Sequence, residues 1–175
     1  MISDQPPAVA TAVDHRSLRE VFGHFATGVT VVTTATSHGP VGMTANSFAS
    51  VSLEPALVLF SVARRSQLAA QLEAAECFAV IILAESQRSL AEQFARPGFN
   101  RFGTSQWSPG STGAPVLVGG LASLECSVVE IHCGGDHLII LGRVVAASSG
   151  SSEDPLLFFR GCFDTLGRSE GPSDR

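Results

Sequence analysis

The chain has 175 residues, four cysteines, a formal net charge of -5, 45% hydrophobic residues and only 15% charged residues. This length and composition fit one compact domain that buries a core without disulfides or a structural metal. The sequence holds no lysine and no basic run, which argues against binding nucleic acid and excludes a P-loop or Schiff-base lysine. The longest apolar run, residues 77–84, is too short to span a bilayer, and the scattered cysteines suggest reduced thiols. We therefore expect a cytoplasmic protein without membrane contact.

The first part of the chain changes from a helical pattern to a strand pattern. Residues 1–14 are expected to form a flexible arm, followed by a helix with one apolar face that ends by Gly28. β-branched and alternating residues then predict a hairpin with a turn at residues 37–40. Its strands would cover residues 29–36 and 41–53, followed by a strand over 56–63, a short helix over 67–75, a strand over 77–84 and a helix over 86–95.

The second part of the chain adds strands to the same domain, which we place at residues 15–166. Residues 96–115, rich in Gly, Ser, Pro and Thr, predict a long surface loop. Two strands, 121–133 and 137–147, flank a tight Gly-Gly-Asp turn, and a final strand covers 156–166 before a disordered tail at 167–175. The hairpin links favour a mainly β, antiparallel fold, and closing the sheet into a β-barrel with peripheral helices would remove its costly edges.

Short polar side chains gather in residues 44–52, where five of nine residues carry a hydroxyl or an amide. A flavin has a flat ring with hydrogen-bonding groups along one edge and a hydroxylated ribityl chain. Small neutral side chains match these groups without burying a charge. The pattern favours a flavin site or, as an equal alternative, the polar outer face of a barrel strand.

Two further stretches could bind polar ligands. At a strand end, Arg64-Arg65-Ser66 could hold a phosphate, or it could be an N-cap serine beside two solvated arginines. Residues 132–137 place two imidazoles, a thiol and a carboxylate around a turn. This turn could bind a metal, dock a nicotinamide cofactor, or be an ordinary exposed turn; no second His or carboxylate cluster lies close by to complete a metal shell. There is no GxGxxG fingerprint, so a dinucleotide would not bind by the Rossmann device.

Several strings occur together in one order along most of the chain. They cover residues 24–33, 42–48, 50–53, 78–80, 101–102, 113–117, 121–126, 135–137 and 142–144. In this order they resemble the short-chain flavin reductase family, the reductase components of two-component flavin-dependent monooxygenases.

The resemblance implies a split β-barrel homodimer with flavin near the dimer interface. It also implies an NAD(P)H-dependent flavin reductase: a hydride passes from NADH or NADPH to FAD or FMN, and reduced flavin diffuses to a separate monooxygenase. By the same resemblance His137 is the catalytic residue, and no metal takes part. The implied cofactor-binding residues are Met43, Thr44, Ala45, Asn46, Ser47 and Ser50 for the ring and ribityl chain, Ser61, Val62, Ala63, Arg64 and Ser66 toward the phosphate, Phe102, and Gly135, Asp136 and His137 for the nicotinamide.

Two other functions stay open at this point. A non-catalytic flavin-binding or electron-carrier module would share the hydroxyl-rich stretch but would not need the turn at residues 135–137. A metal-dependent enzyme would instead use His132, Cys133 and His137.

Overall fold

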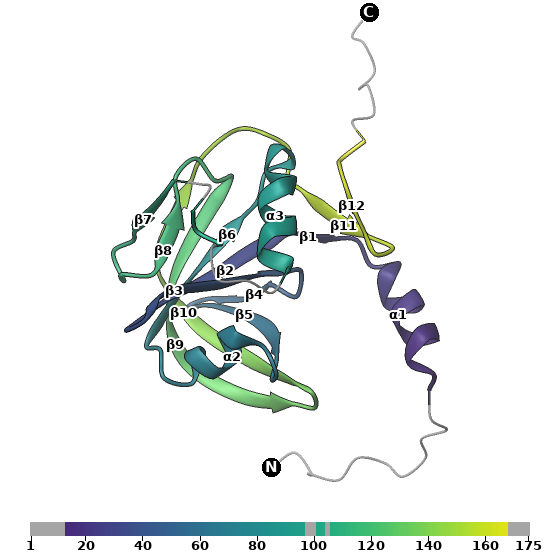
Figure 1. Cartoon of the computed structure of the whole chain (residues 1–175), viewed down its shortest axis with the longest axis horizontal. Helices are drawn as coiled ribbons and strands as arrows, with labels where there is room; N and C mark the ends of the chain where they lie inside the picture. The colour runs from purple at the N-terminus through teal and green to yellow at the C-terminus, as the bar shows by residue number, and fades with distance from the viewer. Residues whose placement is uncertain (1–12, 97–100, 104–105, 168–175) are drawn as a thin grey trace, which may run out of the picture.

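The fold is mainly antiparallel β structure, as a computed structural model of residues 13–96, 101–103 and 106–167 shows (Figure 1). Seven strands form the main sheet, in the spatial order β3-β2-β6-β9-β10-β5-β4. This confirms the predicted fold class. The strands are β2 (Thr30–Thr36), β3 (Gly39–Ala45), β4 (Ala49–Leu53), β5 (Ala56–Ala63), β6 (Cys77–Ile82), β9 (Ala122–Gly134) and β10 (His137–Ser149).

The sheet coils without closing, so the barrel is split. Its two edge strands, β3 and β4, are consecutive in the chain and are joined by residues 46–48. In this connection the Ser47 hydroxyl donates to the backbone oxygen of Ser61 and accepts from its backbone nitrogen, both at 2.9 Å. The Ser47 side chain thus ties the β3–β4 connection to β5.

Strands β2 and β6 form the centre of the core, because both of their faces are covered. One face packs inside the barrel, where Phe60 and Phe78 meet edge to face at 5.2 Å between ring centroids, under α2 (Gln67–Leu72). The other face packs against α3 (Arg88–Ala95) through residues such as Ile81 and Phe94. This double burial explains why residues 30–34 are all buried, although an ordinary barrel strand alternates.

Smaller elements lie around the sheet, and three of them correct the sequence-based expectations. The predicted strand over 41–53 breaks at 46–48 into β3 and β4. The predicted loop over 96–115 contains β7 (Trp107–Pro109), which pairs with β8 (Pro115–Leu117). The predicted last strand is a hairpin of β11 (Leu157–Phe159) and β12 (Cys162–Asp164), whose turn residues have positive φ. A two-residue strand, β1 (Thr27–Gly28), pairs with β11, and a 3-10 turn, η1 (Glu85–Gln87), precedes α3.

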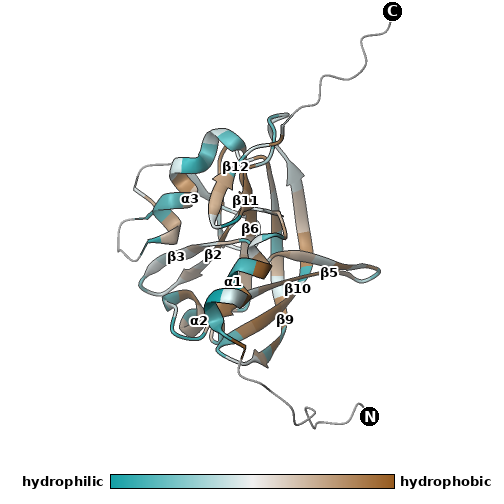
Figure 2. Ribbon diagram, turned by 90° about the vertical axis from the view of Figure 1, so that its right-hand side faces the viewer, coloured by the Kyte–Doolittle hydropathy of each residue, from teal (hydrophilic) through white to brown (hydrophobic). Residues whose placement is uncertain are grey.

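The N-terminal helix α1 (His15–Gly23) stands apart from the core. Its N-cap is Asp14, whose carboxylate accepts from the Ser17 backbone nitrogen at 3.1 Å. The helix ends five residues before Gly28, so the predicted end was wrong. None of its residues is buried, although Figure 2 shows hydrophobic as well as hydrophilic stretches on it. The predicted arm (1–14) and tail (167–175) lie almost wholly outside the described residues.

Candidate functional site

Two neighbouring cavities lie between β3 and the segment that follows β5. The larger, of about 610 Å³, is called the main cavity here. The smaller, of about 410 Å³, is called the side groove and shares Gln67 and Arg101 with the main cavity. The main cavity is lined by Met43, Thr44, Ala63, Arg65, Ser66, Gln67, Leu68, Phe94, Ala95 and Arg101.

The end of β5 turns sharply into α2 and forms one wall of the main cavity. The Ser66 backbone nitrogen donates to the Ala63 oxygen at 2.9 Å, and the Ser66 hydroxyl accepts from the Ala69 nitrogen at 3.0 Å. Ser66 is therefore the N-cap of α2, which confirms the predicted cap and leaves the predicted phosphate site untested. The turn also exposes Arg65 beside the cavity, where a guanidinium can meet an anionic ligand.

The β9–β10 turn lies against this same wall. His137 is the register partner of Ala63 across the β10–β5 ladder. The Arg64 backbone nitrogen donates to the Asp136 oxygen at 3.0 Å, and Arg64 Nε donates to the Gly135 oxygen at 3.0 Å. Gly135 has a φ of 71°, which glycine adopts without strain. Residues 61–66 and 135–137, which the resemblance assigned to the two cofactors, are thus in contact.

Asp136 orients the His137 ring. The two side chains lie 2.7 Å apart at Nδ1 and Oδ1. The hydrogen bond from His137, followed by the charge of that ring, lowers the pKa of Asp136 below its usual range. Since a carboxylate only accepts, Nδ1 of His137 carries the proton of this hydrogen bond. His137 remains accessible, with its side chain 45% exposed.

The hydroxyls of the predicted flavin stretch are used largely within the protein. Thr44 Oγ1 donates to the Ala91 oxygen at 2.6 Å and so ties β3 to α3. The Ser47 hydroxyl is engaged by the backbone of Ser61, as described above. Asn46 and Ser50 are exposed. The stretch therefore shapes the β3 side of the site at least as much as it offers free polar groups.

Two other predicted site residues face the core with their side chains. Ala45 is 6% exposed and Val62 is fully buried. The Ala45 oxygen accepts from Thr30 Oγ1 at 2.8 Å. A flavin could touch either residue only through the backbone.

Arg101 was missing from the predicted site, although the string Arg101-Phe102 was visible in the sequence. Its Nη1 donates to the Gly42 oxygen of β3. Its Nε is buried and has no hydrogen-bond partner among the residues that the structure describes. Nε itself does not face the cavity, so an anionic ligand would meet the other N–H groups of this cavity-lining guanidinium. Sequence reasoning also missed Gln67, Leu68, Phe94 and Ala95, whereas Arg65 belongs to the stretch that it offered as a possible phosphate site.

Phe102 lines the side groove and not the main cavity. Its ring packs against Phe94 and Trp107, with centroids 5.1 and 4.9 Å away. This aromatic cluster holds the segment that carries Arg101 against α3 and β7.

A metal site on the β9–β10 hairpin finds no support in the described part of the chain. His132 Nε2 pairs with Glu130 at 2.8 Å, while His137 pairs with Asp136. No group of three or more His, Cys, Asp or Glu side chains that could hold a metal occurs among the described residues. In that same part of the chain, no helix has both the length and the apolar character needed to cross a membrane.

The fold and the site together define a flavin-binding split barrel, and comparison with known proteins identifies the family. The family model described as "Flavin reductase like domain" matches residues 22–167. The chain belongs to this flavin reductase family.

Curated relatives match most of the chain. A flavin-dependent monooxygenase reductase subunit, HsaB, from Rhodococcus jostii is 43% identical over 152 residues, 87% of this chain and 78% of the relative. An NADH-dependent FMN reductase, SmoA, from Agrobacterium fabrum is 44% identical over 153 residues, 87% of each chain.

A solved structure has the same fold. The NADH:FAD oxidoreductase SgcE6 of Streptomyces globisporus, in complex with NAD and FAD fragments, superposes with a TM-score of 0.84. It is 42% identical, and the match covers 92% of this chain and 96% of that one.

Proposed function

We propose that this chain is an NADH-dependent flavin reductase that accepts FAD or FMN and supplies reduced flavin to a separate monooxygenase. The observation that carries the proposal is the contact of Arg64 with the turn at residues 135–137, because its neighbours Ala63, Arg65 and Ser66 line the main cavity. One ligand in the cavity and another against the turn would be neighbours. The relatives named as NADH-dependent reductases and as a monooxygenase reductase subunit support the same assignment.

The main cavity fits a flavin in size and in chemistry. Its volume lies within the range of about 300–1,000 Å³ that is usual for small-molecule sites. Met43, which is partly exposed, offers apolar surface for a flat ring, while Arg65 and Arg101 suit a phosphate.

In this function the chain acts mainly by positioning. Bound together, nicotinamide and flavin supply the hydride chemistry, which needs little help from an acid or a base. The chain's task is to hold the two rings about 3–3.5 Å apart. Arg64 fixes the turn, Asp136 fixes the His137 ring, and His137 then orients the nicotinamide. The assignment of NADH in place of NADPH rests on the relatives.

The test is to mix purified protein, NADH and FMN without oxygen and to follow the nicotinamide absorbance. A loss of absorbance that requires both protein and flavin supports the reductase. Flavin binding without NADH oxidation would contradict it and would favour the electron-carrier alternative.

We also propose that the chain forms a homodimer in which a second copy covers α1. Val21, Phe22 and Phe25 at this helix are 66%, 64% and 77% exposed, a large apolar surface for an isolated monomer. The expected sedimentation is that of a dimer, and Phe22→Asp should shift it toward the monomer. A monomeric wild-type protein would contradict this proposal.

A cytoplasmic location is proposed for two reasons. All four cysteines are unpaired, as in a reducing compartment. The proposed reaction also consumes NADH, a cofactor of the cell interior. Fractionation of the native host that placed the chain outside the cytoplasm would contradict this location.

A further inference from the structure

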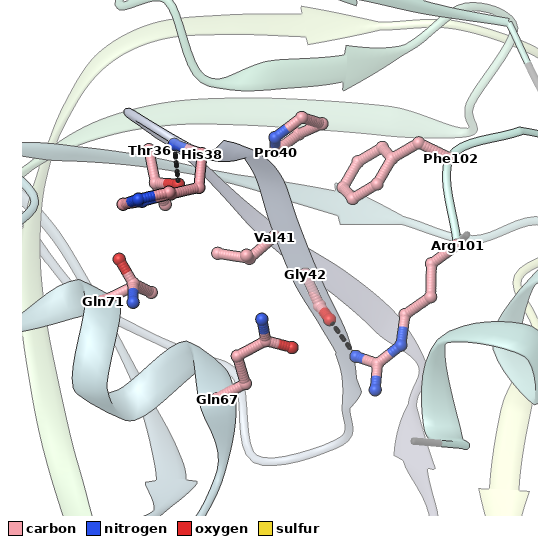
Figure 3. A pocket seen from close by; sticks show the side chains of 9 residues that line it. All are labelled: Thr36, His38, Pro40, Val41, Gly42, Gln67, Gln71, Arg101 and Phe102. Atoms are coloured by element: carbon pink, nitrogen blue, oxygen red, sulfur yellow. Dashed lines mark hydrogen bonds between the residues drawn. The ribbon is translucent and has the colours of Figure 1, made fainter. Parts of the chain in front are cut away.

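The side groove lies next to the main cavity and is not needed for the isoalloxazine ring. On one side it is bounded by the β2–β3 hairpin with Thr36, His38 and Val41, and on the other by Gln67 and Gln71 of α2 (Figure 3). Arg101 and Gln67 line both the groove and the main cavity. A ligand that extends from the main cavity past Arg101 would therefore enter the groove.

Arg101 marks the junction between the two spaces. Figure 3 shows its guanidinium reaching back to the oxygen of Gly42 on β3. A guanidinium carries five N–H groups, and because Arg101 lines both spaces it can donate to a ligand at the junction. A guanidinium binds phosphate oxygens with two parallel hydrogen bonds, and one phosphate beyond that of FMN would lie close to this place.

The groove beyond Arg101 suits a polar aromatic base. Gln67 and Gln71 are four residues apart on α2, so both amides project from one face of the helix (Figure 3). Each amide offers both a donor and an acceptor, which is the pattern along the amino edge of adenine. Val41 and Phe102 add apolar surface, and no acidic residue lines the groove to repel a phosphate.

We infer that the side groove binds the adenylate half of FAD, so that this chain binds FAD more tightly than FMN. The inference rests on the proposed function, because it assumes that the flavin ring and its first phosphate occupy the main cavity. FAD is FMN joined to AMP, so the second phosphate would meet Arg101 and the adenine would lie between Gln71 and His38. Gln71 then determines flavin choice without touching the reacting ring.

Equilibrium binding of FAD and of FMN, measured without NADH, tests the inference in three proteins. These are the wild type, Gln71→Ala and the control Gln106→Ala, which removes the same amide from an exposed site outside both cavities. The single tryptophan, Trp107, packs on Phe102 of the groove, so its fluorescence gives a readout independent of activity. We expect Gln71→Ala to raise the Kd for FAD about three- to tenfold and to leave the Kd for FMN unchanged. Gln106→Ala should change neither.

AMP provides a second arm, because it carries the adenylate without the flavin. AMP should weaken FAD binding to the wild type in competition, should not weaken FMN binding, and should lose its effect in Gln71→Ala. Equal wild-type affinities for FAD and FMN, or an equal change of both in Gln71→Ala, would overturn the inference while leaving the proposed function intact. Failure to bind either flavin would instead overturn the proposed function, and the inference with it.

The adenylate of NADH could occupy the side groove in place of the adenylate of FAD. Steady-state kinetics distinguish the two. With FMN as the flavin, the KM for NADH should be the same in the wild type and in Gln71→Ala. A rise of that KM in the variant would assign the groove to NADH and overturn the inference.

Discussion

The two walls of the main cavity use their polar groups differently. On the β3 side, Thr44 and, in the connection that follows, Ser47 give their hydroxyls to backbone groups of α3 and β5. On the opposite wall Arg65 is exposed, and Arg101, which contacts β3, also lines the cavity. The difference teaches that the hydroxyls of this stretch shape the site, so we expect the arginines to recognise the ligand.

The largest effect on binding is expected at the arginine wall. Arg65→Gln should raise the Kd for flavin about 10- to 100-fold, because a charge-assisted hydrogen bond to phosphate contributes about 1.5–3 kcal/mol. The unfolding free energy should change by less than about 0.5 kcal/mol, since the side chain is exposed. Flavin titration and urea unfolding measure the two quantities. Arg143→Gln, an exposed arginine on β10, is the control, and an equal loss of affinity there would point to a general charge effect.

On the hydroxyl wall the expected loss is in stability. Ser47→Ala should lower the free energy of unfolding by about 1–3 kcal/mol, because the backbone nitrogen and oxygen of Ser61 both lose their side-chain partner. Ser50→Ala, at an exposed position on β4, should change it by less than about 0.5 kcal/mol. Urea unfolding compares the two variants. Equal stability of both would show that Ser47 does not join the connection to β5.

The β9–β10 turn should affect the nicotinamide and not the flavin. We expect His137→Ala to raise the KM for NADH about three- to tenfold while the Kd for flavin stays constant, because the ring lies beside the turn and outside the main cavity. Steady-state kinetics measure the KM for NADH, and flavin titration measures the Kd for flavin. An unchanged KM and an unchanged rate would remove His137 from the mechanism.

The pH dependence of the turn follows from Asp136. Its pKa is lowered by the hydrogen bond from His137, so the stabilising contact is fully present above the ordinary aspartate pKa and is lost as pH falls through the lowered value. Asp136 therefore stays ionised between roughly pH 6 and 8, and its protonation should not change the KM for NADH in that range. Asp136→Asn should reproduce part of the His137→Ala effect at neutral pH, and wild-type behaviour of that variant would contradict the orienting role.

The smallest effect is expected at Thr44. It distinguishes a residue that stabilises the fold around the site from one that binds the flavin. Thr44→Val keeps the side-chain shape but loses the donor to the Ala91 oxygen, which should cost about 0.5–1.5 kcal/mol of stability. The Kd for flavin should change less than about twofold, a change too small for a lost ligand hydrogen bond. A tenfold loss of flavin affinity at constant stability would show instead that Thr44 binds the flavin.

Local sequence signals were enough for some elements and not for others. The strand at 56–63 matches β5 because its alternation is bounded by Pro55 and by two arginines, and the Gly135-Asp136 turn was readable from its glycine. The break at 46–48 was not readable, because its cause is the tertiary bond from Ser47 to β5. Residues of similar polarity continue on both sides of the break.

Only part of the site was predicted, because some of its residues reach the cavity through tertiary contacts that no local sequence signal shows. Met43, Thr44, Ala63 and Ser66 do line the main cavity; Met43 and Thr44 belong to a string that carries the family resemblance, and the same resemblance implied Ala63 and Ser66. Arg101 reaches the cavity by contacting Gly42, 59 residues earlier in the chain, and no local pattern encodes that approach. Gln67 was missed because side-chain directions around a strand-to-helix turn depend on the backbone geometry of that turn.

A crystal structure of this protein soaked with flavin and a nicotinamide cofactor tests the central claim most directly. We predict the isoalloxazine in the main cavity between β3 and residues 63–68, with the nicotinamide against the turn at 135–137. Flavin density elsewhere, with the main cavity filled only by solvent, would contradict the account.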